Sequence, residues 1–108
     1  MPVVRIVLED VDDPEADRLL MQLRVDGDGR ALRHESVFGV CGNLTDGGNR
    51  YPFVLMPDGT LDFGTFVKNE TDRFWRFRWT GQVKPGERAT VTADGDEYTF
   101  QITLVTPL

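Results

Sequence analysis

The feature that most constrains the fold is a period-two alternation of apolar and polar residues on both sides of a tight turn. Such alternation indicates strands that are buried on one face. Asp94-Gly95, between two alternating runs, is a dipeptide that two-residue hairpin turns favour. A hairpin turning here has a consistent register on both faces, with inner pairs Val91–Tyr98 and Ala89–Phe100, outer pairs Thr90–Thr99 and Thr92–Glu97, and Ile102 and Leu104 continuing the inner face.

The same combination of alternation and turn sequence recurs along the chain. Asp26-Gly27-Asp28-Gly29 and Pro57-Asp58-Gly59 are both turn formers. The segments between the turns predict strands at about 3–9, 19–25, 32–40, 51–56, 60–67, 73–79, 88–93 and 97–104. This spacing predicts an all-β single domain over residues 1–108, with about 7–8 antiparallel strands in a β-sandwich or a small barrel. The pattern leaves the choice between sandwich and barrel open.

Two segments are harder to interpret. Asp13-Pro14-Glu15 resembles a helix start, but the residues after it also alternate as a strand would. We favour a strand at 19–25 and keep a helix over 14–25 as the alternative. Residues 39–50 are rich in glycine and asparagine, and they predict a long irregular loop.

The stretch from Arg73 to Trp79 contains both tryptophans of the chain. Read as a strand, it places three large aromatics on the inner face: Trp75, Phe77 and Trp79. We therefore expect this face to be the centre of the core. The outer face carries Phe74, Arg76 and Arg78. Arginine beside an aromatic ring suits a protein interface, and the alternative is that these arginines pair with acids on neighbouring strands.

Charge and composition exclude several classes of protein. The net charge of −6 argues against nucleic-acid binding, which needs a basic surface. No apolar run approaches the ~20 residues of a membrane span. The chain has one cysteine and so no internal disulfide, and its first residues do not resemble a signal peptide. These features predict a cytoplasmic, acidic protein with no membrane association.

The negative charge is concentrated near the N-terminus. Residues 9–17 contain six acidic side chains, among them Asp10, Asp12 and Asp13. Such a run is either a solvated loop or a surface that attracts a partner with a basic patch.

Sequence patterns for catalysis are weak. His34 and Cys41 are single residues of their kinds, and a thiol–imidazole pair requires the chain to bring them together. The acids that follow Asp26 do not match a calcium-binding loop, since position 6 of that loop is Ala31 and position 12 is Val37. We expect no metal site, no cofactor and no enzymatic activity.

These observations favour a non-catalytic protein-binding module, such as an inhibitor or an immunity-type protein that covers part of a partner's surface. The expected partner-binding residues are Asp10, Asp12, Asp13, Phe74, Arg76 and Arg78. One alternative is a small-ligand-binding β-barrel whose mouth is framed by residues 39–50. A further alternative is an enzyme that uses His34 or Cys41.

Overall fold

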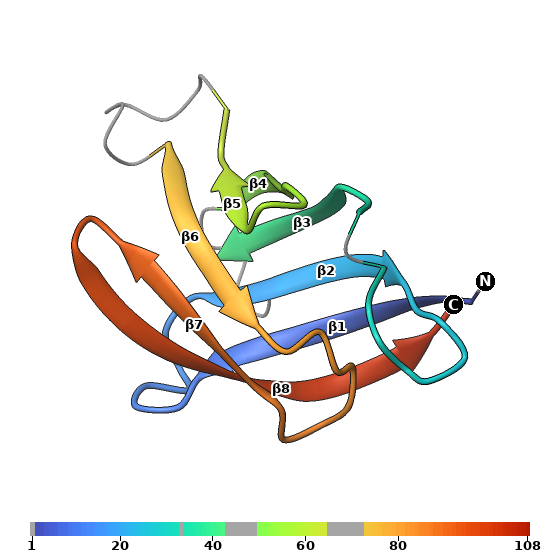
Figure 1. The fold of residues 1–108 in the computed structure, drawn as a ribbon. Helices are drawn as coiled ribbons and strands as arrows, with labels where there is room; N and C mark the ends of the chain where they lie inside the picture. Colours follow the sequence, from blue (N-terminus) through green and yellow to red (C-terminus); the bar gives the residue numbers. More distant parts are fainter. Residues whose placement is uncertain (1, 33, 43–49, 65–72) are drawn as a thin grey trace.

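The computed structural model describes residues 2–32, 34–42, 50–64 and 73–108. These ranges form eight strands: β1 (Val3–Asp10), β2 (Arg18–Arg24), β3 (Val37–Gly42), β4 (Arg50–Leu55), β5 (Thr60–Asp62), β6 (Phe74–Trp79), β7 (Arg88–Ala93) and β8 (Asp96–Pro107). Each strand pairs antiparallel with the next, and β8 returns to pair with β1, so that the sheet closes into a barrel (Figure 1). The all-β prediction is therefore confirmed, and the open choice is resolved in favour of a barrel.

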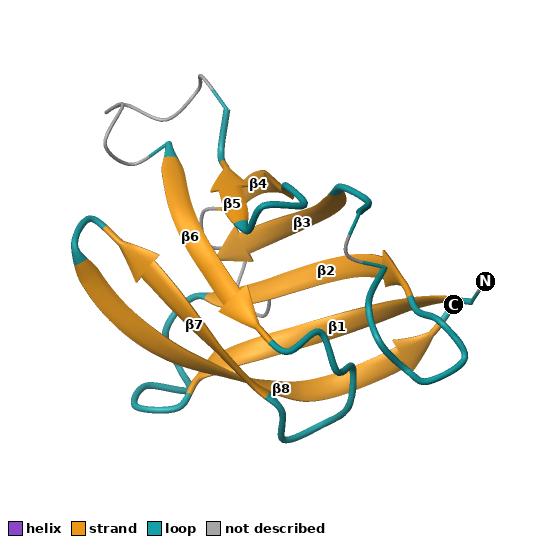
Figure 2. Ribbon diagram, in the orientation of Figure 1, coloured by secondary structure: helices purple, strands orange, loops and turns teal. Residues whose placement is uncertain are grey.

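Strands and loops account for all the described residues, and Figure 2 shows no helix among them. In these ranges there is thus no helix long and apolar enough to cross a membrane. The helix considered for residues 14–25 is wrong. Residues 14–16 form a turn in which the Ala16 N–H donates to the Asp13 carbonyl at 3.0 Å, and β2 follows it.

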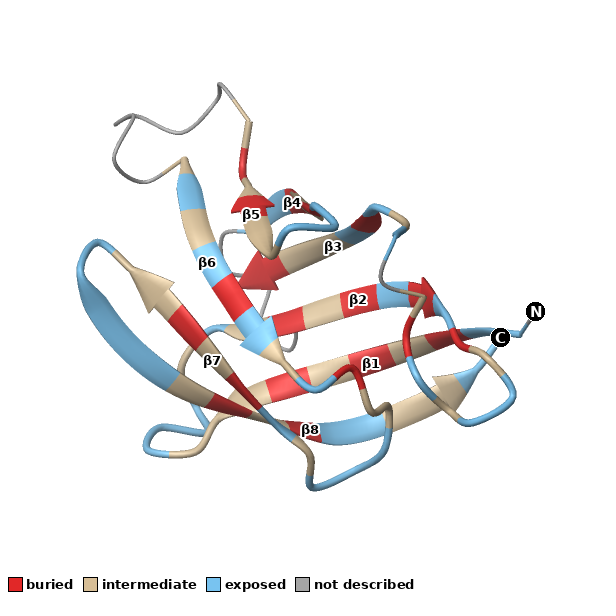
Figure 3. Cartoon of the chain, viewed as in Figure 1, coloured by how far each residue is buried: buried red, intermediate tan, exposed pale blue. Residues whose placement is uncertain are grey.

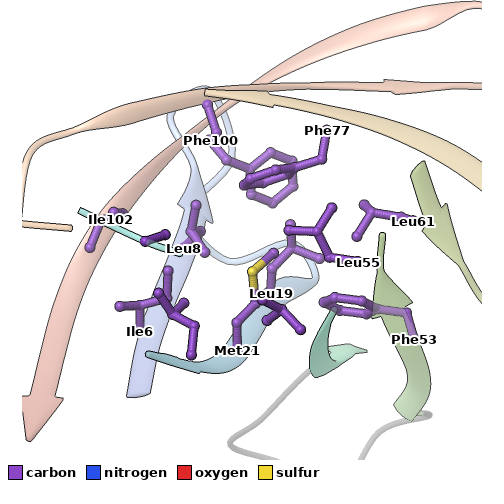
Figure 4. Close-up of a cluster of buried hydrophobic side chains, with 14 of the residues drawn as sticks. Ile6, Leu8, Leu19, Met21, Phe53, Leu55, Leu61, Phe77, Phe100 and Ile102 are labelled. Atoms are coloured by element: carbon purple, nitrogen blue, oxygen red, sulfur yellow. The ribbon is translucent and has the colours of Figure 1, made fainter. Parts of the chain in front are cut away.

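Buried residues alternate with more exposed residues along most strands (Figure 3). On β1, Val4, Ile6 and Leu8 point inward and are buried, and β2 buries Leu19 and Met21 in the same way. Figure 4 shows inward side chains from strands around the barrel meeting in one cluster. The largest fully buried side chains are Ile6, Leu8, Leu19, Met21, Leu61, Ile102 and Val91.

The expected inner face of β6 is confirmed, but its position in the core differs from the prediction. Phe77 is 2% exposed, whereas Trp75 and Trp79 are half-buried and pack against the margin of the core. Phe63 meets Trp75 edge to face, with 4.6 Å between ring centroids. Aliphatic side chains from β1 and β2 occupy the centre because these strands are flanked on both sides by long partners.

The β7–β8 hairpin has the predicted register at all four pairs. Asp94 (φ 52°) and Gly95 (φ 84°) both adopt the left-handed conformation that a tight two-residue turn requires. Two side chains predicted to point inward are exposed, however: Tyr98 by 42% and Leu104 by 54%. A β-bulge in the pairing with β1 inserts one extra residue, Thr103, between the partners of Val7 and Leu8, and this reverses the alternation beyond Ile102.

The second strand of the hairpin at 26–29 begins later than predicted. The turn itself is present, since the Asp26 N–H donates to the Arg30 carbonyl at 2.8 Å. Beyond it the chain turns toward residues 81–82, where the Ala31 N–H donates to the Gly81 carbonyl at 2.8 Å. Ala31 also stays paired with Val25, and the Leu32 N–H donates to the Arg24 carbonyl at 3.2 Å, so residues 31–32 bridge the two segments. The strand β3 starts only at Val37.

The predicted loop at 39–50 was too long, because residues 39–42 belong to β3 and Arg50 begins β4. Residues 43–49 lie outside the described ranges. The predicted strand at 60–67 is also shorter, since β5 ends at Asp62 and residues 65–67 are not described. The predicted turn at Pro57-Asp58-Gly59 joins β4 to β5, and Leu55 pairs with Leu61 across it.

Candidate functional site

Asp10, Asp12 and Asp13 lie at one end of the barrel, where β1 leads into β2. Asp10 ends β1, and its Oδ1 accepts the Asp12 N–H at 2.9 Å, which shapes the turn. Asp12 and Asp13 are exposed. None of these three carboxylates forms an ion pair with a described residue. Their negative charge is therefore available to the solvent or to a partner.

A second group of acids lies at the same end of the barrel, in the β7–β8 turn (Figure 1). The two segments are linked by a hydrogen bond of 3.0 Å from the Val11 N–H to the Thr99 carbonyl. We call the two groups together the acidic end, and it consists of Asp10, Asp12, Asp13, Glu15, Asp17, Asp94, Asp96 and Glu97. Among these carboxylates, Glu97 alone forms an ion pair with a described residue, and its Oε1 lies 3.1 Å from Arg78.

Phe74 opens β6 and points outward, where it is 52% exposed. The Arg73 guanidinium carbon lies 4.7 Å from the centre of the Phe74 ring. Arg73 is held there by Asp62, whose Oδ1 accepts its Nε–H at 3.1 Å. This bond and a second from the Gly64 N–H lower the pKa of Asp62. The result is an ordered, exposed aromatic surface with a cation over it.

Arg76 and Arg78 follow Phe74 on the same outer face. Arg78 forms its ion pair with Glu97 across β7, and both side chains are more than half exposed, so this pair contributes little to stability. Arg76 forms no ion pair with a described residue. Its charge is one of the smaller influences that lower the pKa of Asp58, after the hydrogen bonds from Thr60. An ion pair across the strands thus explains why an arginine stands at position 78. It does not explain Arg76, whose side chain is exposed and can contact a partner.

The structure brings only part of the predicted set together. Glu97 connects Arg78 to the β7–β8 turn, so the outer face of β6 borders the acidic end. Asp10, Asp12 and Asp13 lie beyond β8, which separates them from β6 and β7 in the strand order. The predicted residues therefore form two neighbouring surfaces, and not one site.

His34 and Cys41 occupy different environments. His34 is exposed in the turn before β3, and the predicted strand position is wrong. Cys41 is buried in β3. Burial, with a smaller effect from the charge of Asp17, raises the pKa of the Cys41 thiol to about 12. The thiol is therefore protonated at neutral pH, which is the opposite of what nucleophilic catalysis requires. The described residues include no group of three or more metal-binding side chains that could hold an ion.

Inward side chains form a buried cluster in the barrel, and two hollows are open to its surface. One, of about 230 Å³, is at the end of the barrel opposite the acidic end. Its base is apolar and its rim is charged, and the lining includes Ala31, Val37, Leu55, Trp79, Glu35 and Asp58. Of the mouth predicted at residues 39–50, the described residues 39–42 and 50 do not line this hollow, and residues 43–49 lie outside the described ranges.

One surface was not anticipated from the sequence. Five apolar side chains lie in register on the outside of five neighbouring strands, β8-β1-β2-β3-β4, and we call them the apolar band: Leu104, Val7, Leu20, Val40 and Pro52. Val7, Leu20 and Val40 are half-buried, and Pro52 and Leu104 are exposed. The sequence signal was that the outer face of β1 carries Val3 and Val7 beside two charged residues, whereas a solvated strand face is normally polar.

Comparison with known proteins gives no relative from which a function could be transferred: no family model, curated protein or solved structure matches the chain.

Proposed function

We propose that this protein is a non-catalytic binding module that recognises a basic surface on a protein partner through its acidic end and covers that surface, as an inhibitor or immunity-type protein does. The observation that carries the proposal is the position of the charges. Acids from two separate segments gather at one end of the barrel, and those of the β1–β2 connection form no ion pair with a described residue. Charge localised in this way steers a basic partner and accelerates association.

The outer face of β6 supports the same function. Phe74 offers exposed ring area that is already ordered by Arg73, and Arg76 is available for hydrogen bonds. Aromatic and arginine side chains dominate the binding energy of many interfaces. In this proposal the acidic end provides the long-range attraction, and the neighbouring β6 face provides part of the contact area.

The test needs a variant that removes charge without changing the fold. In the triple variant Asp10→Asn, Asp12→Asn and Asp13→Asn, the amide oxygen at position 10 can still accept the Asp12 N–H. A matched control, Asp28→Asn with Glu35→Gln and Glu87→Gln, changes the net charge equally at the opposite end of the barrel. Affinity capture from the source cell with the parent protein identifies the partner, and surface-based kinetics then compares the three proteins at two ionic strengths.

We expect the triple variant to associate roughly tenfold more slowly than the parent at low salt. The difference should nearly vanish at about 1 M salt, where the Debye length is about 3 Å. The control should keep the parental rate. Equal rates for the triple variant and the parent at low salt would refute the role of the acidic end. A loss of binding in Phe74→Ala or Arg76→Ala alone would then assign the contact to β6.

The small-ligand alternative rests on the surface hollow near Trp79. Its volume of about 230 Å³ is below the ~300–1,000 Å³ of most ligand sites. A thermal-shift screen against metabolites tests this alternative. A ligand that raises the melting temperature of the parent, but not that of a Trp79→Ala variant, would establish it.

A further inference from the structure

The apolar band is an unusual feature for the outside of a barrel. The solvated face of an antiparallel sheet is normally polar, because polar side chains lose nothing by remaining in water. Here Val7 pairs directly with Leu104 on one side and with Leu20 on the other, and Val40 continues the row. The row therefore crosses five strands without a polar residue.

Arg5 lies next to the band on the outside of β1. It is two residues before Val7 on the same face of β1. Arg5 forms no ion pair with a described residue, and its Nε atom is buried without a hydrogen-bond partner among them. Because Nε is covered by its own chain, a second molecule could contact Arg5 only through the two terminal nitrogens of the guanidinium group.

Glu9 lies two residues after Val7, again on the same face of β1. Four residues of strand separate it from Arg5 by about 13 Å, so the two cannot pair within one chain. Arg18 engages Oε1 of Glu9 at 3.2 Å. The carboxylate can accept a second cation through its other oxygen.

We propose that the apolar band is the contact surface of a symmetric homodimer, in which two copies pack band to band about a two-fold axis parallel to the band. This operation places Val7 on Val7 and Leu20 on Leu20 of the second copy. It also reverses the direction of the strands, so that Arg5 of each copy faces Glu9 of the other. Two identical Arg–Glu pairs form, as a self-complementary two-fold contact requires.

The remaining positions beside the band are compatible with the same axis. On β2, Gln22 faces Arg18 of the second copy, and on β3, Phe38 faces Gly42. No two like charges meet at these positions. A two-fold axis along β1 would instead place Arg5 on Arg5 and Glu9 on Glu9, and repulsion disfavours it. The axis parallel to the band also directs the two acidic ends in opposite directions, away from each other.

The size of the surface predicts a weak dimer. Because the closed barrel curves away at β8 and β4, only the three central strands can lie flat against a second copy. Strand spacing of about 4.8 Å and same-face spacing of about 6.8 Å give these strands roughly 300 Å² per copy. The pair would bury on the order of 600 Å², which is below the ~1,200 Å² of a stable specific interface, so we expect a transient dimer with a dissociation constant in the high micromolar range.

This inference is independent of the proposed function, because the band lies on β8-β1-β2-β3-β4 and the proposed partner surface lies on β6 and at the acidic end. The experiment is sedimentation velocity from about 5 µM to about 1 mM protein. The parent should shift from monomer to dimer over this range. Leu20→Lys should raise the dissociation constant at least tenfold, and Phe74→Lys, an equal change on β6, should leave it unaltered.

A mixing experiment tests the orientation of the two copies. Arg5→Glu places Glu against Glu9 of a second identical copy, and Glu9→Arg places Arg against Arg5. Each variant alone should therefore remain monomeric at concentrations where the parent dimerises. An equimolar mixture forms two opposite-charge pairs across the interface and should dimerise within a few-fold of the parental affinity.

Circular dichroism of each variant verifies that it is folded. The proposal is overturned if the parent stays monomeric up to about 1 mM, or if Leu20→Lys dimerises like the parent. It is equally overturned if the mixture of folded variants fails to associate. Should Glu9→Arg not fold because its new charge lies beside Arg18, the pair Arg5→Glu and Glu9→Gln provides the same comparison, with the mixture expected to associate more tightly than Arg5→Glu alone.

Discussion

Replacing Phe77 by alanine tests the arrangement of the core most directly, because β6 supplies its own control. Phe77 and Phe74 are the same residue type three positions apart on one strand, and they are 2% and 52% exposed. Removing a buried phenylalanine ring typically costs about 3–5 kcal/mol, since the cavity refills only in part. Phe77 also meets Trp79 edge to face at 5.4 Å, and this contact is lost with the ring.

The same truncation at Phe74 removes an exposed ring and its contact with Arg73, and contacts of that kind contribute about 0.5–1 kcal/mol. A domain of this length has about 5–15 kcal/mol of stability in total. Each kcal/mol lowers the melting temperature by roughly 4–8 °C, so Phe77→Ala should lose at least about 12 °C and Phe74→Ala only a few degrees. Urea unfolding followed by tryptophan fluorescence measures the free energy of unfolding that each of the two variants loses. Similar losses for the two variants would refute the assignment of inner and outer faces on β6.

Three further outcomes are expected from the structure. Gly95→Val should cost one to a few kcal/mol in urea unfolding, because a β-branched residue must adopt φ near 84° there; an unchanged midpoint would contradict the turn. Cys41, whose thiol pKa is raised to about 12, should react with iodoacetamide at pH 8 roughly a thousandfold more slowly in the folded protein than in urea, and equal rates would contradict this. The pKa of Asp62 is lowered in the folded state, so its stabilising effect is present above the pKa that Asp62 has in the unfolded chain and is lost as the pH falls through the folded value. Asp62→Asn should therefore flatten the acid side of the curve of unfolding free energy against pH. An unchanged curve would count against the pairing of Asp62 with Arg73.

The features that sequence reasoning predicted correctly are local ones. The register of β7 on β8 follows from the turn at Asp94-Gly95 and from alternation on both faces, and neither depends on the rest of the chain. The errors arise where a segment that is distant in the sequence pairs with the residues in question. Ala31 pairs with Val25 as the turn predicts, but it also bonds to Gly81, a residue fifty positions later, and no local pattern contains that second contact.

The bulge at Thr103 is a second example of this limit. Alternation in the sequence continues through Leu104, and the reversal arises only from pairing with β1 at the other end of the chain. For the candidate site, the acids and the β6 side chains were identifiable from charge and period. The distance between the acids and the β6 side chains could not be predicted, because it depends on how many strands lie between them. The apolar band was missed since its members come from five strands and form a row only after the barrel has closed.

Closure of the barrel by β1 and β8 has a consequence for how the chain folds. Val4 pairs with Pro107, about a hundred residues away, and the Leu108 N–H donates to the Val3 carbonyl at 3.0 Å. Contacts this distant in sequence make folding slow, in the range of milliseconds to seconds. During synthesis, β1 must wait for nearly the whole chain before its partner exists, with one edge of its backbone unpaired throughout. β1 is therefore vulnerable to intermolecular pairing for longest, and the twelve residues of β8 end that exposure.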